Sequence, residues 1–366
     1  MKIAIIGGGI NGLTSAWKLA ANGYKVDLYE EKELLSQTSS SSSKLLHGGI
    51  RYLEYGHFSL VRQSLLDRHR WIKLAPEFCK PIKMFMPVYS DSQRSGLILF
   101  IGAFVYRLLA GSYSLGPTSW HSKKDTEELC PDINPYKLKG AISFYDAQMD
   151  EKNLGKWVHQ QALEYGVNIY ENSPITTFDN EGKLKVHNKI KKYNFIINAA
   201  GPWAELLNKK NNITTNYSLE LIRGSHLIVN KKISNPFIFQ ELDGKRIVFV
   251  LPYLGKTLIG TTEVQHDSKE KISCSDAERD YLLDLYNSKF TNPITKEDIN
   301  NDFSGLRPII RKNNTQSVFS YISASRESVI EVNKNILTVY GGKWTSALSL
   351  SDELFIKLKR LVKNYG

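Results

Sequence analysis

A glycine-rich turn between a strand and a helix near the amino terminus constrains this chain more than any other feature. Residues 2–6 are mostly apolar and predict a buried parallel strand, and a G-x-G-x-x-G motif occupies residues 7–12. Leu13–Asn22 then predicts a helix, and Val26–Tyr29 predicts a second strand that ends at Glu30. Strand, turn, helix, strand and acidic residue in this register predict a dinucleotide-binding unit.

Each residue type in this motif has a physical task. Gly7 permits the tight turn out of the strand, Gly9 lets a pyrophosphate approach the backbone, and Gly12 lets the helix pack closely on the sheet. Asn11 lies within the same turn, so we expect it to contact the nucleotide. The Glu30 carboxylate can accept hydrogen bonds from ribose hydroxyls and would repel a 2′-phosphate, which disfavours NADP. The motif itself leaves FAD and NAD open.

A serine run at residues 38–43 leads into a glycine-punctuated segment. Such runs are typical of flexible linkers, but a linker here would sever the nucleotide fold after two strands. We therefore expect a loop of hydroxyls and amides against phosphate or ribityl oxygens, with Lys44 adding positive charge. Gly48-Gly49 would let the chain pass beneath a flat ring. Arg51 can hold a phosphate with forked hydrogen bonds, and Tyr52 adds a hydroxyl.

The segment TSSSSSKLLHGGIRYLE resembles the flavin-linked glycerol-3-phosphate dehydrogenases of the D-amino-acid-oxidase-like flavoprotein superfamily. The resemblance continues in family order over nearly the whole chain, at residues 144–150 (FYDAQMD), 195–203 (FIINAAGPW), 221–229, 246–262, 305–308 (GLRP) and 340–345 (YGGKWT). It therefore implies FAD as the cofactor.

The resemblance also implies which residues form the site. It implies cofactor contacts from Thr38, Ser39, Ser43, Lys44, Leu45, Ala200, Gly201, Gly341, Gly342, Lys343, Trp344 and Thr345. It implies contacts with a small phosphorylated substrate from Arg51, Tyr52 and His47.

The reaction implied by the resemblance is oxidation of sn-glycerol 3-phosphate to dihydroxyacetone phosphate. A hydride would pass from C2 to flavin N5, and the electrons would go on to quinone or another acceptor. The hydroxyl proton requires a base, for which imidazole is suited near neutral pH. His226 is the first candidate and His47 the rival, although a histidine on an apolar strand is more often a core residue. Arg307 would stabilise the alkoxide or the phosphate, and Lys343 would lie near the flavin or the phosphate.

Three other interpretations remain open from the residues. One is a flavin oxidase or dehydrogenase of the same fold that acts on a different small hydroxy or amino acid. Another is an NAD-linked dehydrogenase. The third is a basic protein that binds nucleic acid or anionic lipid, because Lys and Arg number 48 against 37 Asp and Glu, for a net charge of +11. The charges are scattered and no nucleic-acid-binding motif occurs, so we expect no nucleic-acid partner.

The cysteines argue against both a disulfide framework and a metal site. There are 3, an odd number, and none forms a C-x-x-C pair, so we expect a reducing, cytoplasmic location and no bound metal. The apolar stretch Leu97–Gly111 is interrupted by Arg107 and is short for a membrane span. We expect it to be a buried helix. The alternative is a segment lying in the membrane interface, with the protein peripheral on the inner face.

We expect an α/β protein with a Rossmann-like FAD-binding domain and an interleaved, mostly antiparallel substrate domain. The FAD-binding domain is expected to comprise residues 1–75, 140–210 and 300–366, and the substrate-binding domain residues 76–139 and 211–299. The long members of the family continue into a helical carboxy-terminal domain, whereas this chain ends at Gly366, which is the expectation for a short form. Oligomeric state and electron acceptor are left open.

Overall fold

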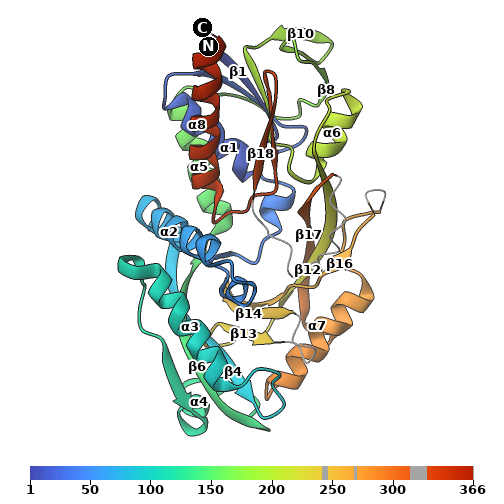
Figure 1. Cartoon of the computed structure of the whole chain (residues 1–366). Coiled ribbons are helices and arrows are strands. Elements are labelled where there is room, and N and C mark those ends of the chain that lie inside the picture. The colour runs from blue at the N-terminus through green and yellow to red at the C-terminus, as the bar shows by residue number, and fades with distance from the viewer. Residues whose placement is uncertain (241–245, 268–269, 314–327, 366) are drawn as a thin grey trace. The chain divides into compact units, whose positions relative to one another are not determined.

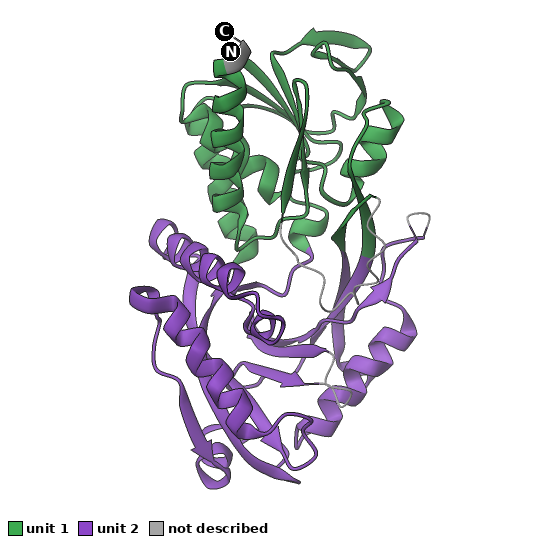
Figure 2. Ribbon diagram, in the orientation of Figure 1, with its two compact units in different colours: residues 1–40, 150–221, 307–366 green, residues 41–149, 222–306 purple. Residues whose placement is uncertain are grey.

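The chain folds into two compact units, as seen in a computed structural model that describes residues 1–240, 246–267, 270–313 and 328–365. Unit 1 comprises residues 1–40, 150–221 and 307–366, and unit 2 comprises residues 41–149 and 222–306 (Figure 2). Both units are built from segments that are separated in the sequence, so the interleaved arrangement of the chain is a property of the fold.

Unit 1 contains a sheet whose six described strands have the order β18-β19-β11-β1-β2-β7 (Figure 1). Their bounds are Lys2–Ile6 (β1), Lys25–Tyr29 (β2), Asn168–Tyr170 (β7), Phe195–Asn198 (β11), Val329–Asn333 (β18) and Ile336–Tyr340 (β19). All neighbours are parallel except β18 and β19, which form an antiparallel hairpin at one edge. The predicted amino-terminal strand is therefore central, and the expected α/β fold class is observed.

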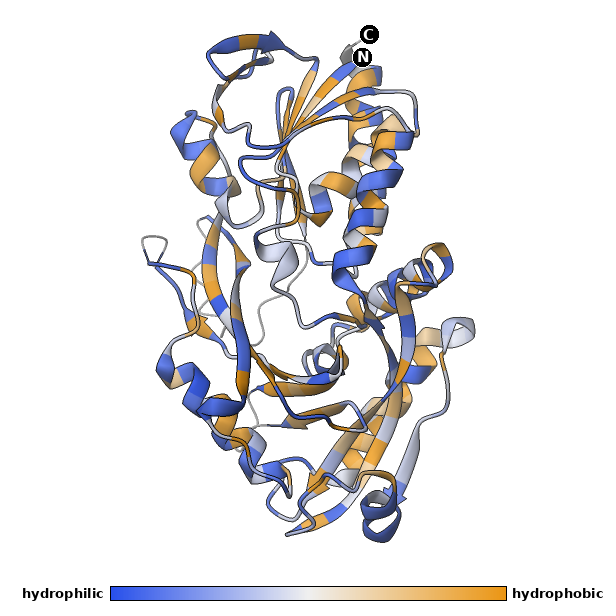
Figure 3. Ribbon diagram, turned by 180° about the vertical axis from the view of Figure 1, so that it is seen from behind, coloured by the Kyte–Doolittle hydropathy of each residue, from blue (hydrophilic) through white to orange (hydrophobic). Residues whose placement is uncertain are grey.

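The side chains of successive residues of β1 point to opposite faces of this sheet, because side chains alternate along a strand. Ala4 and Ile6 belong to a buried cluster with residues of a small three-stranded sheet. Ile5 lies beneath the first helix, beside Gly12. Most residues of the central strands are hydrophobic (Figure 3), as expected for parallel strands covered on both faces, although Asp27 of β2 is also buried.

Helices of unit 1 cover the sheet together with that small sheet. Their bounds are Ile10–Ala20 (α1), Glu151–Glu164 (α5), Ala204–Lys210 (α6) and Ala347–Tyr365 (α8), and the small sheet consists of Ile175–Phe178 (β8), Lys183–Val186 (β9) and Lys189–Lys192 (β10). Helix α1 packs between α5 and α8, with Trp17 edge-on to Trp157 at 5.5 Å and Lys18 paired with Asp352. The predicted helix begins earlier, at Ile10, so that Gly12 of the glycine motif lies in its first turn.

Unit 2 is built on a large, mostly antiparallel sheet with the order β16-β12-β15-β14-β13-β4-β6-β3, in which β17 also pairs with β12 and β5 with β6. Its strands are Leu45–Leu46 (β3), Cys79–Tyr89 (β4), Ser119–Ser122 (β5), Leu138–Met149 (β6), Tyr217–Val229 (β12), Phe237–Gln240 (β13), Ile247–Tyr253 (β14), Lys256–Gly260 (β15), Val264–Gln265 (β16) and Ile299–Lys312 (β17). Strands β12 and β17 each run from one unit into the other.

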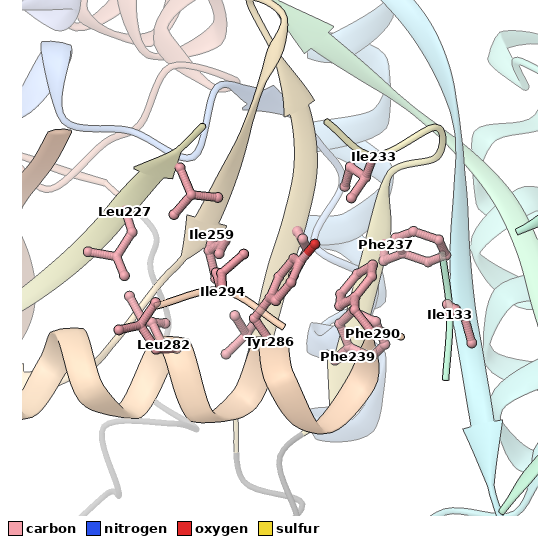
Figure 4. Close-up of a cluster of buried hydrophobic side chains, with 14 of the residues drawn as sticks. Ile133, Leu227, Ile233, Phe237, Phe239, Ile259, Leu282, Tyr286, Phe290 and Ile294 are labelled. Atoms are coloured by element: carbon pink, nitrogen blue, oxygen red, sulfur yellow. The ribbon is translucent and has the colours of Figure 1, made fainter. Parts of the chain in front are cut away.

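Two apolar clusters hold unit 2 together. Its helices are Phe58–Leu74 (α2), Gly96–Ala110 (α3), Lys123–Leu129 (α4) and Asp276–Lys289 (α7). Helix α7 lays Leu282 and Tyr286 against strand residues that include Leu227 and Phe239 (Figure 4). Helices α2 and α3 contribute to a second cluster with β4 and β6.

Short 3-10 helices connect these elements. They span Thr38–Ser40 (η1), Ile50–Tyr55 (η2), Gly111–Tyr113 (η3), Gly201–Trp203 (η4) and Lys296–Asp298 (η5). Two of them, η1 and η2, lie in segments that the sequence assigned to the site.

The expectation that the apolar stretch after residue 96 forms a buried helix is wrong. It is helix α3, but only Leu99, Ala103, Tyr106 and Ala110 are buried, at the spacing of one helical face. Large apolar side chains on the other face are between 41% and 69% exposed: Leu97, Ile98, Ile101, Phe104 and Leu108. The segment Gly96–Tyr113 is also long and apolar enough to cross a membrane by length and composition alone. A uniformly apolar stretch does not reveal which of its faces another element covers.

The boundaries of the compact units differ from the predicted domain boundaries. Residues 41–75 lie in unit 2, because β3 pairs with β6 and α2 packs on β4. Residues 140–149 belong to β6, which pairs with β4 along its length and so stays with unit 2. Residues 211–221 belong to unit 1 and residues 300–306 to unit 2, the reverse of the prediction. The long strands β12 and β17 each run from one unit into the other, so the boundary falls within them.

Candidate active site

The predicted site residues fall into two clusters, one in each unit. Unit 1 holds Gly7, Gly9, Asn11, Gly12, Glu30, Thr38, Ser39, Ala200, Gly201, Arg307, Gly341, Gly342, Lys343, Trp344 and Thr345. Unit 2 holds Ser43, Lys44, Leu45, His47, Arg51, Tyr52 and His226. Each cluster is assembled from segments far apart in the chain.

The opening turn of unit 1 is shaped by its glycines. Gly7 has φ +107°, a left-handed conformation, and a Cβ there would lie 2.5 Å from the Ala199 carbonyl oxygen. A Cβ on Gly12 would lie 1.9 Å from the Gly7 carbonyl oxygen. Larger residues at these positions would push helix α1 away from the strand. At Gly9 the nearest atom to such a Cβ is Ser39 Oγ, at 3.1 Å.

Glu30 sits where β2 ends and binds the backbone of the opening turn. Its carboxylate accepts hydrogen bonds from the Gly8 N–H at 2.6 Å and from the Lys32 N–H at 2.9 Å. A carboxylate offers about four acceptor positions, so two such bonds leave capacity for the hydroxyls of a ribose. The residue can therefore hold the turn and a nucleotide together.

The first half of the serine run is part of unit 1 and is no linker. Ser39 Oγ accepts a hydrogen bond from the Ile10 N–H at 3.0 Å, in the first turn of helix α1. The Ser39 carbonyl accepts from the Trp344 indole N–H at 2.8 Å. Helix amino termini carry unsatisfied N–H groups that favour anions, and this loop lies across such an end.

The closing glycine pair lies beside the opening turn, although 330 residues separate the two. The Asn11 side-chain amide donates to the Gly341 carbonyl at 3.3 Å, and Gly341 and Gly342 have φ +72° and +85°. Asn11 Oδ1 is buried and has no hydrogen-bond partner among the described residues. An orphaned acceptor at a helix start, beside Glu30 and the serine loop, fits the donors of a bound dinucleotide.

The remaining predicted residues of unit 1 occupy defined positions. Ala200 and Gly201 form the turn after β11, next to the strand end that contacts Gly7. Arg307 lies within strand β17, not in a surface loop. Lys343 follows the glycine pair and is half-buried. The carboxyl ends of parallel strands β1, β2, β11 and β19 share one edge of the sheet, where α/β folds bind ligands.

His226 is the centre of the cluster in unit 2. Its imidazole is 2% exposed on β12, and its Nε2 lies 2.9 Å from Ser43 Oγ. The ring stacks on Phe303 with 4.9 Å between centroids and 13° between planes. On β15, Gly260 pairs directly with His226, and a Cβ there would lie 2.2 Å from the imidazole Cδ2. The imidazole is held by a hydroxyl, an aromatic face and a position that tolerates no side chain.

The second half of the serine run completes this cluster. The Lys44 ammonium lies 4.8 Å from the centre of the Phe303 ring, a cation–π contact. A Cβ on Gly305, the first residue of the GLRP segment, would lie 2.7 Å from Ser41 Cβ. The serine loop, the GLRP segment and His226 therefore meet in three dimensions. Ser43, expected to contact FAD, is hydrogen-bonded to the candidate base.

Sequence reasoning missed Phe303 and Gly260. Phe303 precedes Gly305 by two positions, so both lie on the same side of strand β17. That alternation is a signal that was available in the sequence once GLRP was placed on a strand. Gly260 carries no comparable signal, because its importance comes from the strand paired with it.

His47 lies over the same sheet as His226. Its ring is 6.0 Å from the Phe249 ring, centre to centre. Phe249 on β14 pairs with Gly260, which in turn pairs with His226. Directly paired residues point to the same face of a sheet, so both candidate histidines lie over one face.

Arg51 lies in η2, which begins after Gly49 in a left-handed conformation with φ +72°. Its Nε and Nη2 atoms are buried and have no hydrogen-bond partner within the described parts of the chain. Tyr52 is buried, with its ring packed on Gly49. Leu45, which was expected to contact the cofactor, has its side chain in a buried apolar cluster of unit 2. Buried guanidinium nitrogens without protein acceptors mark a place for an anion.

Comparison with known proteins places this geometry in a family. The family described as FAD dependent oxidoreductase matches residues 2–349. D-erythritol 1-phosphate dehydrogenase of Brucella abortus is 32% identical over 99% of this chain and 74% of that protein. Aerobic glycerol-3-phosphate dehydrogenase of Escherichia coli is 29% identical over 100% of this chain and 74% of that protein.

A solved structure shows the same fold. The glycerol-3-phosphate dehydrogenase of Bacillus halodurans, complexed with FAD, superposes with a TM-score of 0.75 at 22% identity. The match covers 100% of this chain and 65% of that one. The chain thus spans less than two thirds of that enzyme's length.

Proposed function

Because the chain belongs to the family of FAD-dependent oxidoreductases, we propose that it oxidises sn-glycerol 3-phosphate to dihydroxyacetone phosphate. FAD is the cofactor, and when bound it supplies the acceptor for the two electrons of this oxidation. The proposal of a phosphorylated polyol as substrate is supported by relatives whose names specify a glycerol phosphate and an erythritol phosphate.

The observation that carries the proposal is that the Arg51 guanidinium group is partly buried without an acceptor for two of its nitrogens among the described residues. Its Nε and Nη2 are buried and, within the described residues, no acceptor serves either nitrogen. An uncompensated buried charge is expensive, so such a group is retained where a ligand supplies the acceptors. A phosphate oxygen pair matches the guanidinium fork. We assign the substrate phosphate to Arg51, with Tyr52 and His47 in the same loop.

Proton removal is assigned to His226. Oxidation of a secondary alcohol requires that the hydroxyl proton leave as the carbon is oxidised, and imidazole accepts protons near neutral pH. Ser43 and Phe303 hold the ring in one orientation, which limits the positions its nitrogens can take. Arg307 and Lys343 are assigned to stabilising negative charge on the substrate or the cofactor.

Replacement of Arg51 tests the proposal. Arg51→Ala should raise KM for glycerol 3-phosphate by about 100-fold, because charge-assisted hydrogen bonds contribute roughly 1.5–3 kcal/mol each. The Ki of inorganic phosphate as a competitive inhibitor should rise in parallel, with flavin content unchanged. Arg51→Lys should recover only part of the loss, since lysine lacks the fork. An unchanged phosphate Ki in Arg51→Ala would exclude Arg51 from the phosphate site.

A second substrate is favoured by one observation. The erythritol phosphate dehydrogenase is more similar to this chain than the Escherichia coli glycerol-3-phosphate dehydrogenase. Anaerobic addition of glycerol 3-phosphate, erythritol phosphate and a panel of hydroxy and amino acids to the yellow protein separates these functions. The substrate is the compound that bleaches the flavin fastest; bleaching by a hydroxy or amino acid alone would contradict the proposal.

We also propose that the protein is peripheral on the cytoplasmic face of a membrane, with quinone as the electron acceptor. The exposed apolar face of α3 supports the membrane location, since the surfaces of soluble proteins rarely carry such a row of large apolar side chains. Ile101→Asp with Leu108→Asp should abolish pelleting with anionic vesicles. Leu206→Asp, an equally exposed apolar position on α6, should leave pelleting intact. Wild-type protein that stays in the supernatant would refute the proposal.

A further inference from the structure

The segment of residues 47–52, here named the arginine loop, is tied to helix α3 by one tyrosine. We propose that Tyr106 is a positioning residue that places Arg51 for the substrate phosphate, an inference that rests on the proposed function. Tyr106 is distant from Arg51 in the sequence and belongs to none of the motifs recognised there.

The connection is a hydrogen bond from the arginine loop to the Tyr106 side chain. The Gly48 N–H donates to the Tyr106 hydroxyl oxygen at 2.6 Å. The same hydroxyl donates to the Asp146 carboxylate, at 2.8 Å from Oδ1 and 3.0 Å from Oδ2. Both the donor and the acceptor capacity of the hydroxyl are therefore in use. Burial raises the pKa of Tyr106 well above its usual value, which keeps the hydroxyl protonated.

The far end of this chain of bonds is anchored in the core of unit 2. Asp146 on β6 pairs with the Arg68 guanidinium of α2 at 2.9 Å. Arg68 also donates to the Tyr145 carbonyl at 3.0 Å and to the Tyr113 carbonyl at 3.1 Å. Three secondary-structure elements thus hold the hydroxyl, and of the Arg68 nitrogens only Nε is buried without a hydrogen-bond partner among the described residues.

The near end leaves the arginine loop little freedom. A Cβ on Gly48 would lie 2.6 Å from the Tyr106 hydroxyl and 2.7 Å from Leu65 Cγ, so the backbone is pressed against both side chains. Gly49 then turns the chain with φ +72°, and η2 begins with Ile50 and Arg51. The backbone position of Gly48 therefore sets the point from which the Arg51 side chain starts, three residues later.

The hydroxyl, not the ring, carries this role. The Tyr106 ring packs in the apolar cluster beneath α3 and lies edge-on to Phe144, with centroids 5.9 Å apart. Phenylalanine would keep those contacts and remove only the oxygen that accepts from Gly48. The Gly48 amide would then lose its acceptor at 2.6 Å and keep only the Asp146 carboxylate, so the loop would shift toward that carboxylate.

The test compares Tyr106→Phe with a matched buried tyrosine. Tyr106→Phe should raise KM for glycerol 3-phosphate and the Ki of inorganic phosphate by about fivefold, with kcat changed less than about threefold, because a hydrogen bond contributes roughly 1 kcal/mol. Tyr89→Phe is the control, since the Tyr89 hydroxyl is buried without a hydrogen-bond partner among the described residues. Its kinetic constants should match those of the wild type.

A double variant separates failure of this inference from failure of the proposed function. If Arg51 is the target, Tyr106→Phe should leave the phosphate Ki unchanged in an Arg51→Ala background. An effect of Arg51→Ala with none of Tyr106→Phe would overturn the inference alone. No effect of Arg51→Ala would overturn the proposed function. A loss of kcat at constant phosphate Ki would also overturn the inference.

Hydrogen exchange of the wild-type protein provides a second readout if Tyr106→Phe does not fold. The Gly48 amide should exchange slowly, and saturating inorganic phosphate should slow it further, because phosphate and the Gly48–Tyr106 bond stabilise the same loop conformation. Fast exchange of the Gly48 amide, or an exchange rate that phosphate does not change, would contradict a positioning role.

Discussion

The two clusters of site residues differ in how the chain assembles them. In unit 1, the opening turn and Glu30 come from one stretch of 30 residues, and a Cβ on Gly12 would collide with the Gly7 carbonyl inside that stretch. In unit 2, the surroundings of His226 come from Ser43, Gly260 and Phe303, which lie in three separate segments. The opening turn of unit 1 follows from a contiguous motif, whereas the surroundings of His226 follow from strand pairing.

This difference shows which substitutions each cluster should tolerate. A contiguous turn fails when its backbone path is blocked, so damage there should remove the cofactor as a whole. A cluster made by paired strands holds one side chain in place, so damage there should impair catalysis while the fold and the cofactor remain.

Blocking the opening turn should have the largest effect. Gly12→Val would place a side chain where even a Cβ comes within 1.9 Å of the Gly7 carbonyl, so α1 must move away from β1. We expect complete loss of bound FAD, measured by visible absorbance after gel filtration. Gly102→Ala is the control, because no atom of the described residues lies near its Cβ position. A Gly12→Val protein that purifies with full flavin content would refute the assignment of the turn.

Filling the space beside His226 should impair turnover without loss of cofactor. Gly260→Ala would put a methyl group 2.2 Å from the imidazole, which must then leave its stacked position. We expect kcat to fall by about 10²–10⁴-fold, the usual contribution of a general base, with normal flavin content. Steady-state kinetics on the flavin-loaded variant measure this. Normal kcat would show that the orientation of His226 is irrelevant to the reaction.

A smaller effect is expected from the buried carboxylate next to this cluster. Glu278 on α7 accepts from Ser225, Thr262 and Ser275 and pairs with Arg223 at 2.9 Å. Glu278→Gln leaves the buried Arg223 with only the exposed Glu270, at 3.7 Å, as a counter-charge and should lower the free energy of unfolding by about 3 kcal/mol. Urea denaturation measures this change in the free energy of unfolding. Asp276→Asn, an exposed change on the same helix, should cost less than about 1 kcal/mol, and equal losses would contradict this account.

The same carboxylate predicts a pH dependence of stability. Burial opposes ionisation of Glu278, but hydrogen bonds from Thr262, Ser275 and Ser225 outweigh it and lower its pKa from 4.5 to about 2. A depressed pKa stabilises the fold fully above pH 4.5, and the stabilisation is lost as pH falls toward 2. Wild-type protein should therefore lose roughly 3 kcal/mol over that range that Glu278→Gln does not lose. Parallel pH curves for the two proteins would be the contrary result.

Sequence reasoning identified the elements of the nucleotide-binding sheet with only small errors in their bounds. The strand predicted at residues 2–6 is observed as β1, and the apolar residues before the closing glycine pair form β19. These strands are buried on both faces, so an unbroken apolar run flanked by glycine is enough to identify them. The first helix begins three residues earlier than predicted, since capping at Ile10 depends on Ser39.

Sequence reasoning failed where burial is decided by another segment. Helix α3 was expected to be buried, but only one of its faces packs against the sheet. Phe303 and Gly260 were not recognised, because their roles arise from the strands beside them. Tyr106 gave no sign either, since its partners Gly48 and Asp146 lie about 40 or more residues away.

The sequence by itself determined the glycine turn between strand and helix and the α/β class, and it predicted the residues with which a flavin enzyme of this family can act. Backbone geometry is the reason, because a glycine at a tight turn and an apolar strand obey local rules. Only the tertiary structure decided which hydroxyl, ring and gap surround His226, and which tyrosine holds the arginine loop. Those contacts join segments that are far apart in the chain, and pairing between distant strands brings them together.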